Sequence, residues 1–77
     1  MNLVLDLGNT IIKWAIFQRD TIIDRDILSK ISIGSLKSIH KKYPKINKLC
    51  FANTSNKTKL LEQFCKESQI QYFQLDY

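Results

Sequence analysis

This chain is poor in the residues that mark special classes of protein. Its 77 residues include two glycines, one proline, two cysteines and one histidine. Two cysteines make no disulfide framework, and together with one histidine they make no metal-binding signature. No apolar run approaches the roughly 20 residues that span a bilayer, and no secretory signal opens the chain. The sequence therefore predicts a cytoplasmic protein with no membrane contact.

What is present is an ordinary composition for a folded protein, with 44% hydrophobic and 25% charged residues. No segment repeats, and no linker-like stretch divides the chain. A chain of this length buries only about 60% of the surface that its unfolded form exposes, so its core is small. We expect residues 1–77 to form at most one domain.

The net charge of +5 is concentrated in the second half of the chain. Residues 37–77 carry eight bases and three acids, whereas residues 1–36 carry four of each. A basic run of this kind could attract nucleic acid. It could equally be the solvated face and last turn of a helix, where lysines complement the helix dipole, and we favour this interpretation. The basic run comprises Lys37, Lys41, Lys42, Lys45 and Lys48.

The first part of the chain is patterned as three strands. Residues 3–5 are an unbroken apolar run, which is typical of a strand buried on both faces. Residues 10–17 and 21–28 follow as two further strands, and short polar turns separate all three. Within residues 10–17, Ile12, Trp14 and Ile16 share one face. The short connections predict an antiparallel meander.

The second part has two helical segments, each followed by a strand. Apolar residues recur at helical spacing from Ile33 to Tyr43, with Ser32 or Ser35 as the cap and Pro44 ending the helix. Residues 46–52 and 69–75 read as strands on either side of a helix at 56–67. The order β-β-β-α-β-α-β predicts an α/β fold with a mixed five-stranded sheet and covering helices. This order resembles the ribonuclease H-like half-domain of actin-like ATPases, although order alone carries no function.

The residues with the clearest chemistry lie between the first two predicted strands. Gly8 would let the backbone approach a bulky anion, so that the amides of Gly8, Asn9 and Thr10 face phosphates. Thr10 adds a hydroxyl donor, and Lys13 can place a positive charge near a phosphate tail. Asp6 can hold a water bound to a divalent cation. We therefore expect Asp6, Gly8, Asn9, Thr10 and Lys13 to bind the phosphates of a nucleotide.

A purely structural interpretation of the same residues is also open. The segment could be only a hairpin turn in which Asp6 bonds its own loop, and Lys13 could be an ordinary lysine at a sheet edge. We favour the functional interpretation, because a charge at the end of a fully apolar strand is costly without a purpose. It predicts a tight hairpin with Gly8 or Asn9 at positive φ, and with the Asp6 carboxylate at the floor of a concave space.

The opening of the chain resembles the start of type III pantothenate kinases. Residues 1–13 contain the Asp-x-Gly-Asn-Thr segment that begins that family, and Ala15-Ile16-Phe17 matches the end of its next strand. The later segment Leu49–Ser55, which includes Asn53 and Ser55, is a looser match. Residues 72–75 align with a following short strand.

The resemblance implies a kinase that phosphorylates pantothenate with ATP, on the route to coenzyme A. It also implies Mg²⁺ or another divalent ion, a monovalent cation such as K⁺ or NH₄⁺, and a homodimer for the full-length enzyme. Asp6, Gly8, Asn9, Thr10 and Lys13 would then bind the ATP phosphates, with Asp6 reaching the divalent ion through water.

The family's Gly-x-Asp-Arg segment, which carries its catalytic base, does not occur in these 77 residues. We therefore expect a truncated N-terminal half-domain without a catalytic residue of its own and without activity by itself. Two other interpretations stay open: another small-molecule kinase of the actin-like superfamily, and a small basic nucleic-acid-binding or regulatory module.

Overall fold

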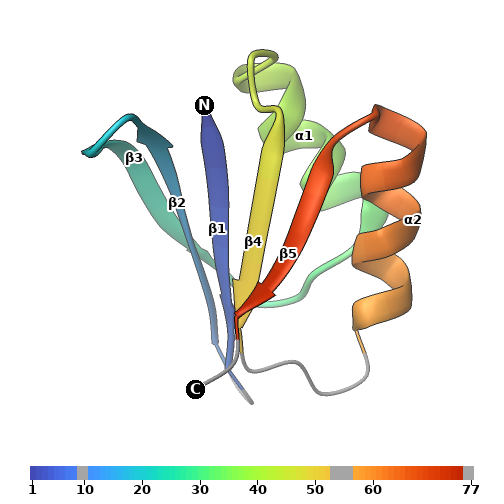
Figure 1. Cartoon of the computed structure of the whole chain (residues 1–77). Helices are drawn as coiled ribbons and strands as arrows, with labels where there is room; N and C mark the ends of the chain where they lie inside the picture. Colours follow the sequence, from blue (N-terminus) through green and yellow to red (C-terminus); the bar gives the residue numbers. More distant parts are fainter. Residues whose placement is uncertain (9–10, 53–56, 76–77) are drawn as a thin grey trace.

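The computed structural model describes residues 1–8, 11–52 and 57–75. Over these ranges the element order is the one that the sequence predicts, and each boundary lies within two residues of the expected one. Figure 1 shows the arrangement. The elements are β1 (Asn2–Leu7), β2 (Ile12–Gln18), β3 (Thr21–Leu28), α1 (Ile33–Lys42), β4 (Lys48–Ala52), α2 (Thr58–Ser68) and β5 (Gln71–Leu75).

The five strands form one mixed sheet in the order β3-β2-β1-β4-β5. The pairs β1–β2 and β2–β3 are antiparallel, which confirms the predicted meander. The pairs β1–β4 and β4–β5 are parallel, because α1 and α2 provide the crossovers that return the chain to the same end of the sheet. The central strand β1 is thus flanked by one antiparallel and one parallel neighbour.

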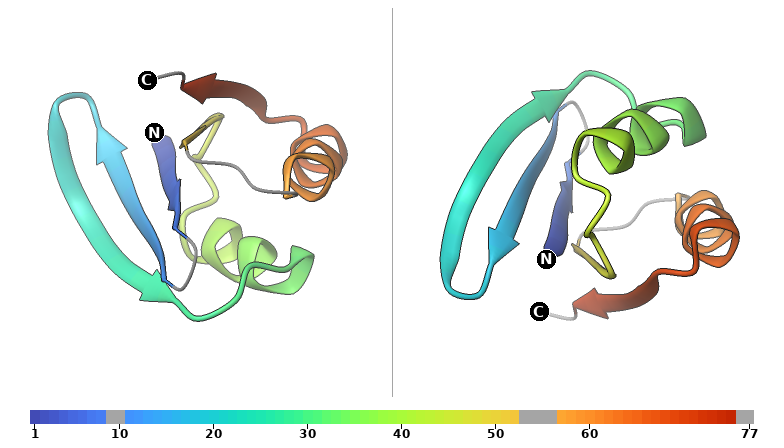
Figure 2. Two further views of the ribbon diagram at one scale, coloured as in Figure 1. Left: turned by 90° about the horizontal axis from the view of Figure 1, so that it is seen from below. Right: turned by 90° about the horizontal axis from the view of Figure 1, so that it is seen from above.

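Both helices lie against the same face of the sheet, so the molecule has two layers (Figure 2). The core lies between these layers, and β1 contributes Leu3, Leu5 and Leu7, all buried. The expectation that β1 is buried on both faces is wrong, since Val4 is only half-buried and Asp6 is exposed. No described element covers the second face.

We call this second face of the sheet the open face. Strand alternation and the pairing registers assign its residues, and all of them that are named below are half-buried or exposed. Ala52 lies on the same face, opposite Asp6, and is buried. A face that remains in contact with water in this way is common in sheets with antiparallel pairs. The open face comprises Val4, Asp6, Lys13, Ala15, Phe17, Arg25, Ile27, Cys50, Phe73 and Leu75.

The helix α1 is held at both ends by side chains. Ser32 is its N-cap, and a capping box joins Ser32 and Ser35, so that each side chain accepts from the other's backbone N–H. At the other end, the Tyr43 hydroxyl donates to the carboxylate of Asp24 on β3. These contacts fix α1 against the β3 side of the sheet.

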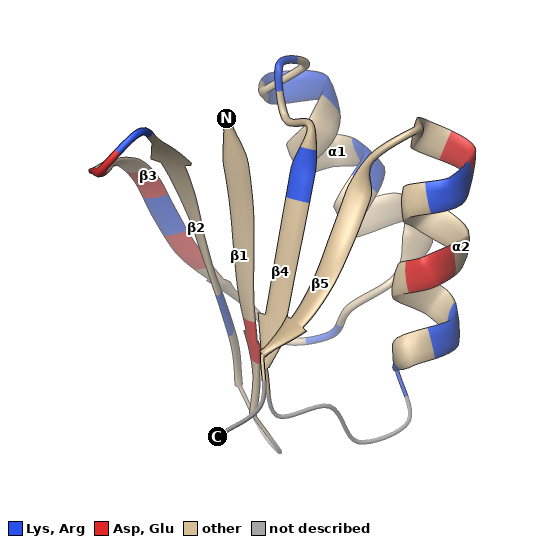
Figure 3. Ribbon diagram, viewed as in Figure 1, with Lys and Arg blue, Asp and Glu red and all other residues tan. Residues whose placement is uncertain are grey.

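The basic run is exposed at every one of its five positions. Figure 3 shows the charges of this run on α1, on the turn after it and at the start of β4. Lys42 lies 3.5 Å from the Asp24 carboxylate. The positions confirm that these lysines are on the solvated surface; whether they contact nucleic acid stays open. No helix in the described ranges is long and apolar enough to cross a membrane.

Candidate functional site

The candidate site lies where β1 turns into β2. The antiparallel pairing runs without interruption to Leu7 opposite Ile12, so residues 8–11 connect two adjacent strands. This confirms the predicted hairpin and excludes a helix between residues 12 and 14. Asn9 and Thr10 lie outside the described residues, as does the segment 53–56. The predicted roles of Asn9 and Thr10 therefore stay predictions.

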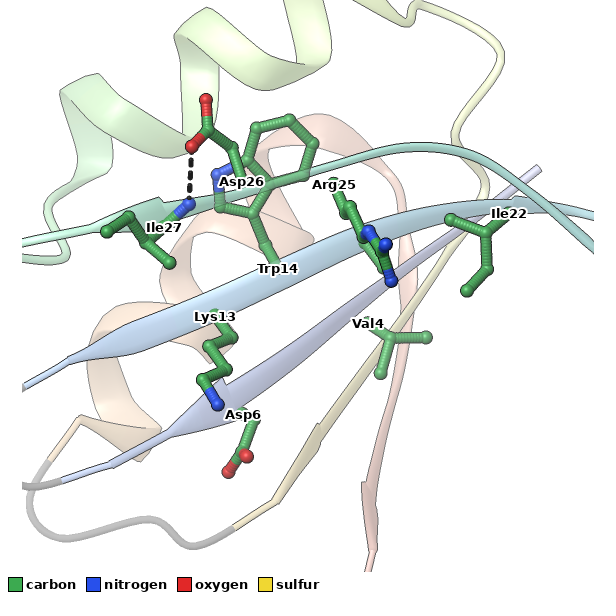
Figure 4. A pocket seen from close by; sticks show the side chains of 9 residues that line it. Val4, Asp6, Lys13, Trp14, Ile22, Arg25, Asp26 and Ile27 are labelled. Atoms are coloured by element: carbon green, nitrogen blue, oxygen red, sulfur yellow. Dashed lines mark hydrogen bonds between the residues drawn. The ribbon is translucent and has the colours of Figure 1, made fainter.

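Asp6 and Lys13 are brought together by the strand register. They are direct cross-strand partners on the open face, and both side chains are exposed. Such partners have Cβ atoms about 4.5–5.5 Å apart. Figure 4 shows the Lys13 side chain extending toward the Asp6 carboxylate. An acid and a base predicted from sequence to serve one site thus lie side by side at the carboxyl end of β1.

The environment of Asp6 differs from the predicted one. The carboxylate was expected at the end of a strand buried on both faces, where its charge would be costly. The side chain is exposed, because it alternates with Leu5 and Leu7 onto the face that the helices do not cover. The cost of burial therefore gives no support to a functional Asp6, and the support that remains is its position beside Lys13.

Gly8 is needed here for a reason other than the predicted one. The prediction was a positive φ at Gly8 or Asn9; the φ of Gly8 is not positive, and Asn9 lies outside the described residues. A Cβ added at Gly8 would lie 2.6 Å from the carbonyl oxygen of Ile11. The loop closes so tightly that a backbone carbonyl occupies the space of a side chain. Steric room, and not backbone handedness, favours glycine at this position.

A hollow of about 430 Å³ on the sheet begins at Asp6 and Lys13. Most of it is apolar, and the Arg25 side chain lies along it as a further cation (Figure 4). Arg25 was not predicted as a site residue; its cross-strand partner Ala15 follows Lys13 by two residues and so lies on the same face of β2. The register of the β2–β3 pairing is what places Arg25 beside Ala15 and so in this hollow. The lining residues are Val4, Asp6, Lys13, Trp14, Ala15, Ile22, Arg25, Asp26 and Ile27.

The donor set at this site suits a phosphate-bound divalent ion better than a protein-only metal site. Within the ranges that the structure describes, no three histidine, cysteine or acidic side chains gather to hold a metal. Mg²⁺ commonly binds through one or two carboxylates, several waters and the phosphates of a substrate. An exposed carboxylate, Asp6, with Lys13 beside it is compatible with that mode of binding.

Comparison with known proteins gives one informative similarity. No protein-family model matches the chain. The chain is 35% identical over 69 residues to a type III pantothenate kinase of Christiangramia forsetii. That match covers 88% of this chain but 28% of the relative, so the chain spans just over a quarter of the relative's length. The chain is thus a compact α/β segment with a weak, partial relationship to a type III pantothenate kinase.

Proposed function

We propose that residues 1–77 are the N-terminal phosphate-binding half-domain of a kinase similar to type III pantothenate kinases. In this proposal the sheet and helices belong to the ribonuclease H-like fold. The complete enzyme transfers the γ-phosphoryl group of ATP to pantothenate. The partial relationship to the Christiangramia forsetii kinase supports the reaction class. The antiparallel-then-parallel sheet is compatible with the proposed fold.

The observation that carries the proposal is the pairing of Asp6 with Lys13 beside the β1–β2 hairpin. Phosphoryl transfer depends mainly on positioning and on stabilising negative charge. Lys13 supplies a positive charge for a phosphate oxygen, while Asp6 orients a water of the divalent ion. Gly8 keeps the loop backbone close, and the amides of Asn9 and Thr10 complete the phosphate cradle.

The proposal predicts that the 77-residue chain alone has no kinase activity. The sequence contains no Gly-x-Asp-Arg segment to supply the base. Incubation with ATP, Mg²⁺, K⁺ and pantothenate should therefore give no phosphopantothenate by mass spectrometry. Turnover above a protein-free control would contradict the assignment of these residues to a half-domain.

A chimera tests the function directly. The matching segment of the Christiangramia forsetii kinase is replaced by this chain, and pantothenate phosphorylation is measured on the folded product. We expect activity, because a related half-domain should present its phosphate site to the rest of the enzyme. A folded chimera that binds pantothenate but not ATP would refute the proposal.

Matched variants of the chimera assign the residues. Asp6→Asn should lower kcat by about 10–100-fold, the usual effect of losing a group that orients a metal-bound water. Lys13→Gln should raise the KM for ATP. Asp20→Asn and Lys45→Gln remove the same charges from exposed positions away from the hairpin and should leave both constants unchanged. Equal losses in the control variants would show a general charge effect instead of a site.

A further inference from the structure

Strand β3 lies at one edge of the five-stranded sheet, and β2 is its neighbour among the strands that the structure describes (Figure 1). The outer side of an edge strand carries backbone N–H groups and carbonyl oxygens that can pair with a strand of another chain. Proteins block such edges with charges, bulges or covering segments. The hydrogen bonds along β3 show how its outer side is blocked.

Two backbone N–H groups of β3 donate to carboxylates of the same strand. The N–H of Arg25 donates to Asp24 Oδ1 at 2.8 Å. The N–H of Ile27 donates to Asp26 Oδ1, also at 2.8 Å. Arg25 and Ile27 are two residues apart, so their N–H groups point to the same side of the strand. This is the outer side, because both groups donate within β3 and not across to β2.

The helix α1 holds one of these two carboxylates in place. Asp24 Oδ1 accepts from the Arg25 N–H, while Asp24 Oδ2 accepts from the hydroxyl of Tyr43. The ammonium group of Lys42 lies 3.5 Å from the same Oδ2 atom. Hydrogen bonds to an ionised acceptor are stronger than those between neutral groups. Because both oxygens of Asp24 have donors, its carboxylate is fixed over the edge of β3.

A strand of another chain would gain little here while both carboxylates stay in place. It would have to displace Asp24 and Asp26 from the N–H groups and bring its own carbonyl oxygens close to two negative charges. Displacement of Asp24 would also break its contact with Tyr43. The register shift between Ile16 and Phe17 further disturbs the ladder beside which the new strand would lie.

We infer that the carboxylates of Asp24 and Asp26 form an intramolecular edge block, which occupies outer N–H groups of β3 and prevents pairing with a strand of another chain. The block depends on hydrogen-bond acceptors in addition to charge, since each carboxylate lies on an N–H that the other strand would need. The helix α1 takes part in it, because Tyr43 and Lys42 position Asp24. The edge block is independent of the proposed kinase function.

Substitutions at Asp26 test the hydrogen bond directly and leave the contact between Asp24 and α1 intact. Asp26→Ala and Asp26→Asn remove the same charge, but asparagine keeps an oxygen that can accept from the Ile27 N–H. Amide hydrogen exchange at Ile27, followed by NMR, should be about two- to tenfold faster in Asp26→Ala than in Asp26→Asn, the effect of one net hydrogen bond. An Ile27 exchange rate that is the same in the two variants would overturn the inference.

Double variants test the consequence for pairing. Sedimentation velocity over a concentration series compares Asp24→Ala/Asp26→Ala with Asp24→Asn/Asp26→Asn, which carry the same net charge. The alanine pair should self-associate at least about tenfold more strongly, because two N–H donors are freed at the edge of each copy. Equal association of the two would show that the carboxylates do not block the edge.

The site of the new contact is checked by the same exchange measurement. In the alanine pair, exchange at Arg25 and Ile27 should become slower as the protein concentration rises, because the second strand then covers these N–H groups. Slowing at other strands and not at β3 would refute the edge block. Circular dichroism checks the fold, and where the alanine pair is unfolded, Asp26→Ala against Asp26→Asn gives the same comparison of association.

Discussion

Replacing Gly8 with alanine tests why the hairpin requires glycine. The added Cβ would lie 2.6 Å from the Ile11 carbonyl oxygen, and must withdraw by at least 0.4 Å to reach 3.0 Å, below which real Cβ contacts are essentially never found. The opposing group is backbone, so it cannot rotate aside as a side chain could. Strain of this kind costs about 1–3 kcal/mol. The lower entropy of the unfolded alanine chain recovers up to about 1 kcal/mol.

The expected net effect of Gly8→Ala is a loss of about 1–2 kcal/mol in the free energy of unfolding. With a urea m-value of about 1 kcal/mol/M for so small a domain, the unfolding midpoint should fall by roughly 1–2 M. Circular dichroism during urea titration measures it. The melting temperature should fall by about 4–8 °C for each kcal/mol.

Gly34→Ala is the matched control for the same chemical change. The added Cβ would meet Ser32 Oγ at 3.7 Å, an ordinary contact, and Gly34 lies within α1. Alanine in a helix is favoured over glycine by about 0.5–1 kcal/mol, so this variant should be more stable than the natural chain. A Gly8→Ala midpoint equal to or above the natural one, with Gly34→Ala raised as expected, would refute the steric account of Gly8.

Three further predictions concern titration, thiol reactivity and charge. The hydrogen bond from Tyr43 lowers the pKa of Asp24 below 3.8. The stabilisation that this bond gives to the fold is therefore present above pH 3.8 and is lost as the pH falls through the lowered pKa. In Tyr43→Phe this loss should be smaller, which acid titration followed by circular dichroism measures. Burial raises the pKa of Cys65 to about 11. A maleimide at neutral pH should therefore label the half-buried Cys50 first. Mass spectrometry that finds Cys65 labelled first would contradict the packing. The basic run should bind labelled nucleic acid only weakly at low salt, and this binding should disappear at physiological salt. Tight binding at physiological salt, measured by fluorescence anisotropy, would favour a nucleic-acid-binding module. This run comprises Lys37, Lys41, Lys42, Lys45 and Lys48.

Much of the fold could be predicted from local sequence. The short polar turns between three apolar segments permit only antiparallel neighbours, and the change to helical spacing after Ser32 marks the crossovers. The faces of β2 were also predicted correctly, with Ile12, Trp14 and Ile16 buried. In the candidate site, the hairpin between β1 and β2 was predicted, whereas the register that sets Asp6 opposite Lys13 was not, because the sequence does not state how many residues the turn uses.

Other features depended on contacts that the spacing of residues along the chain does not specify. An apolar run such as residues 3–5 does not reveal whether one or both of its faces will be covered, and here both helices pack on one face, so Asp6 is exposed. The shift near Ile16 and Phe17 decides which residues of β3 stand beside β2, and so places Arg25 in the hollow.

The sequence by itself determined the order of the elements and the hairpin, because these follow from residue spacing along a few neighbouring turns and strands. Only the tertiary structure decided that both helices pack on one face of the sheet, that the carbonyl of Ile11 leaves no room for a side chain at Gly8, and that Asp6 stands opposite Lys13. The physical reason is that exposure and steric contact depend on which distant segments pack together. The spacing of apolar residues predicts the secondary structure of a segment, whereas the burial of its side chains depends on the segments that pack against it.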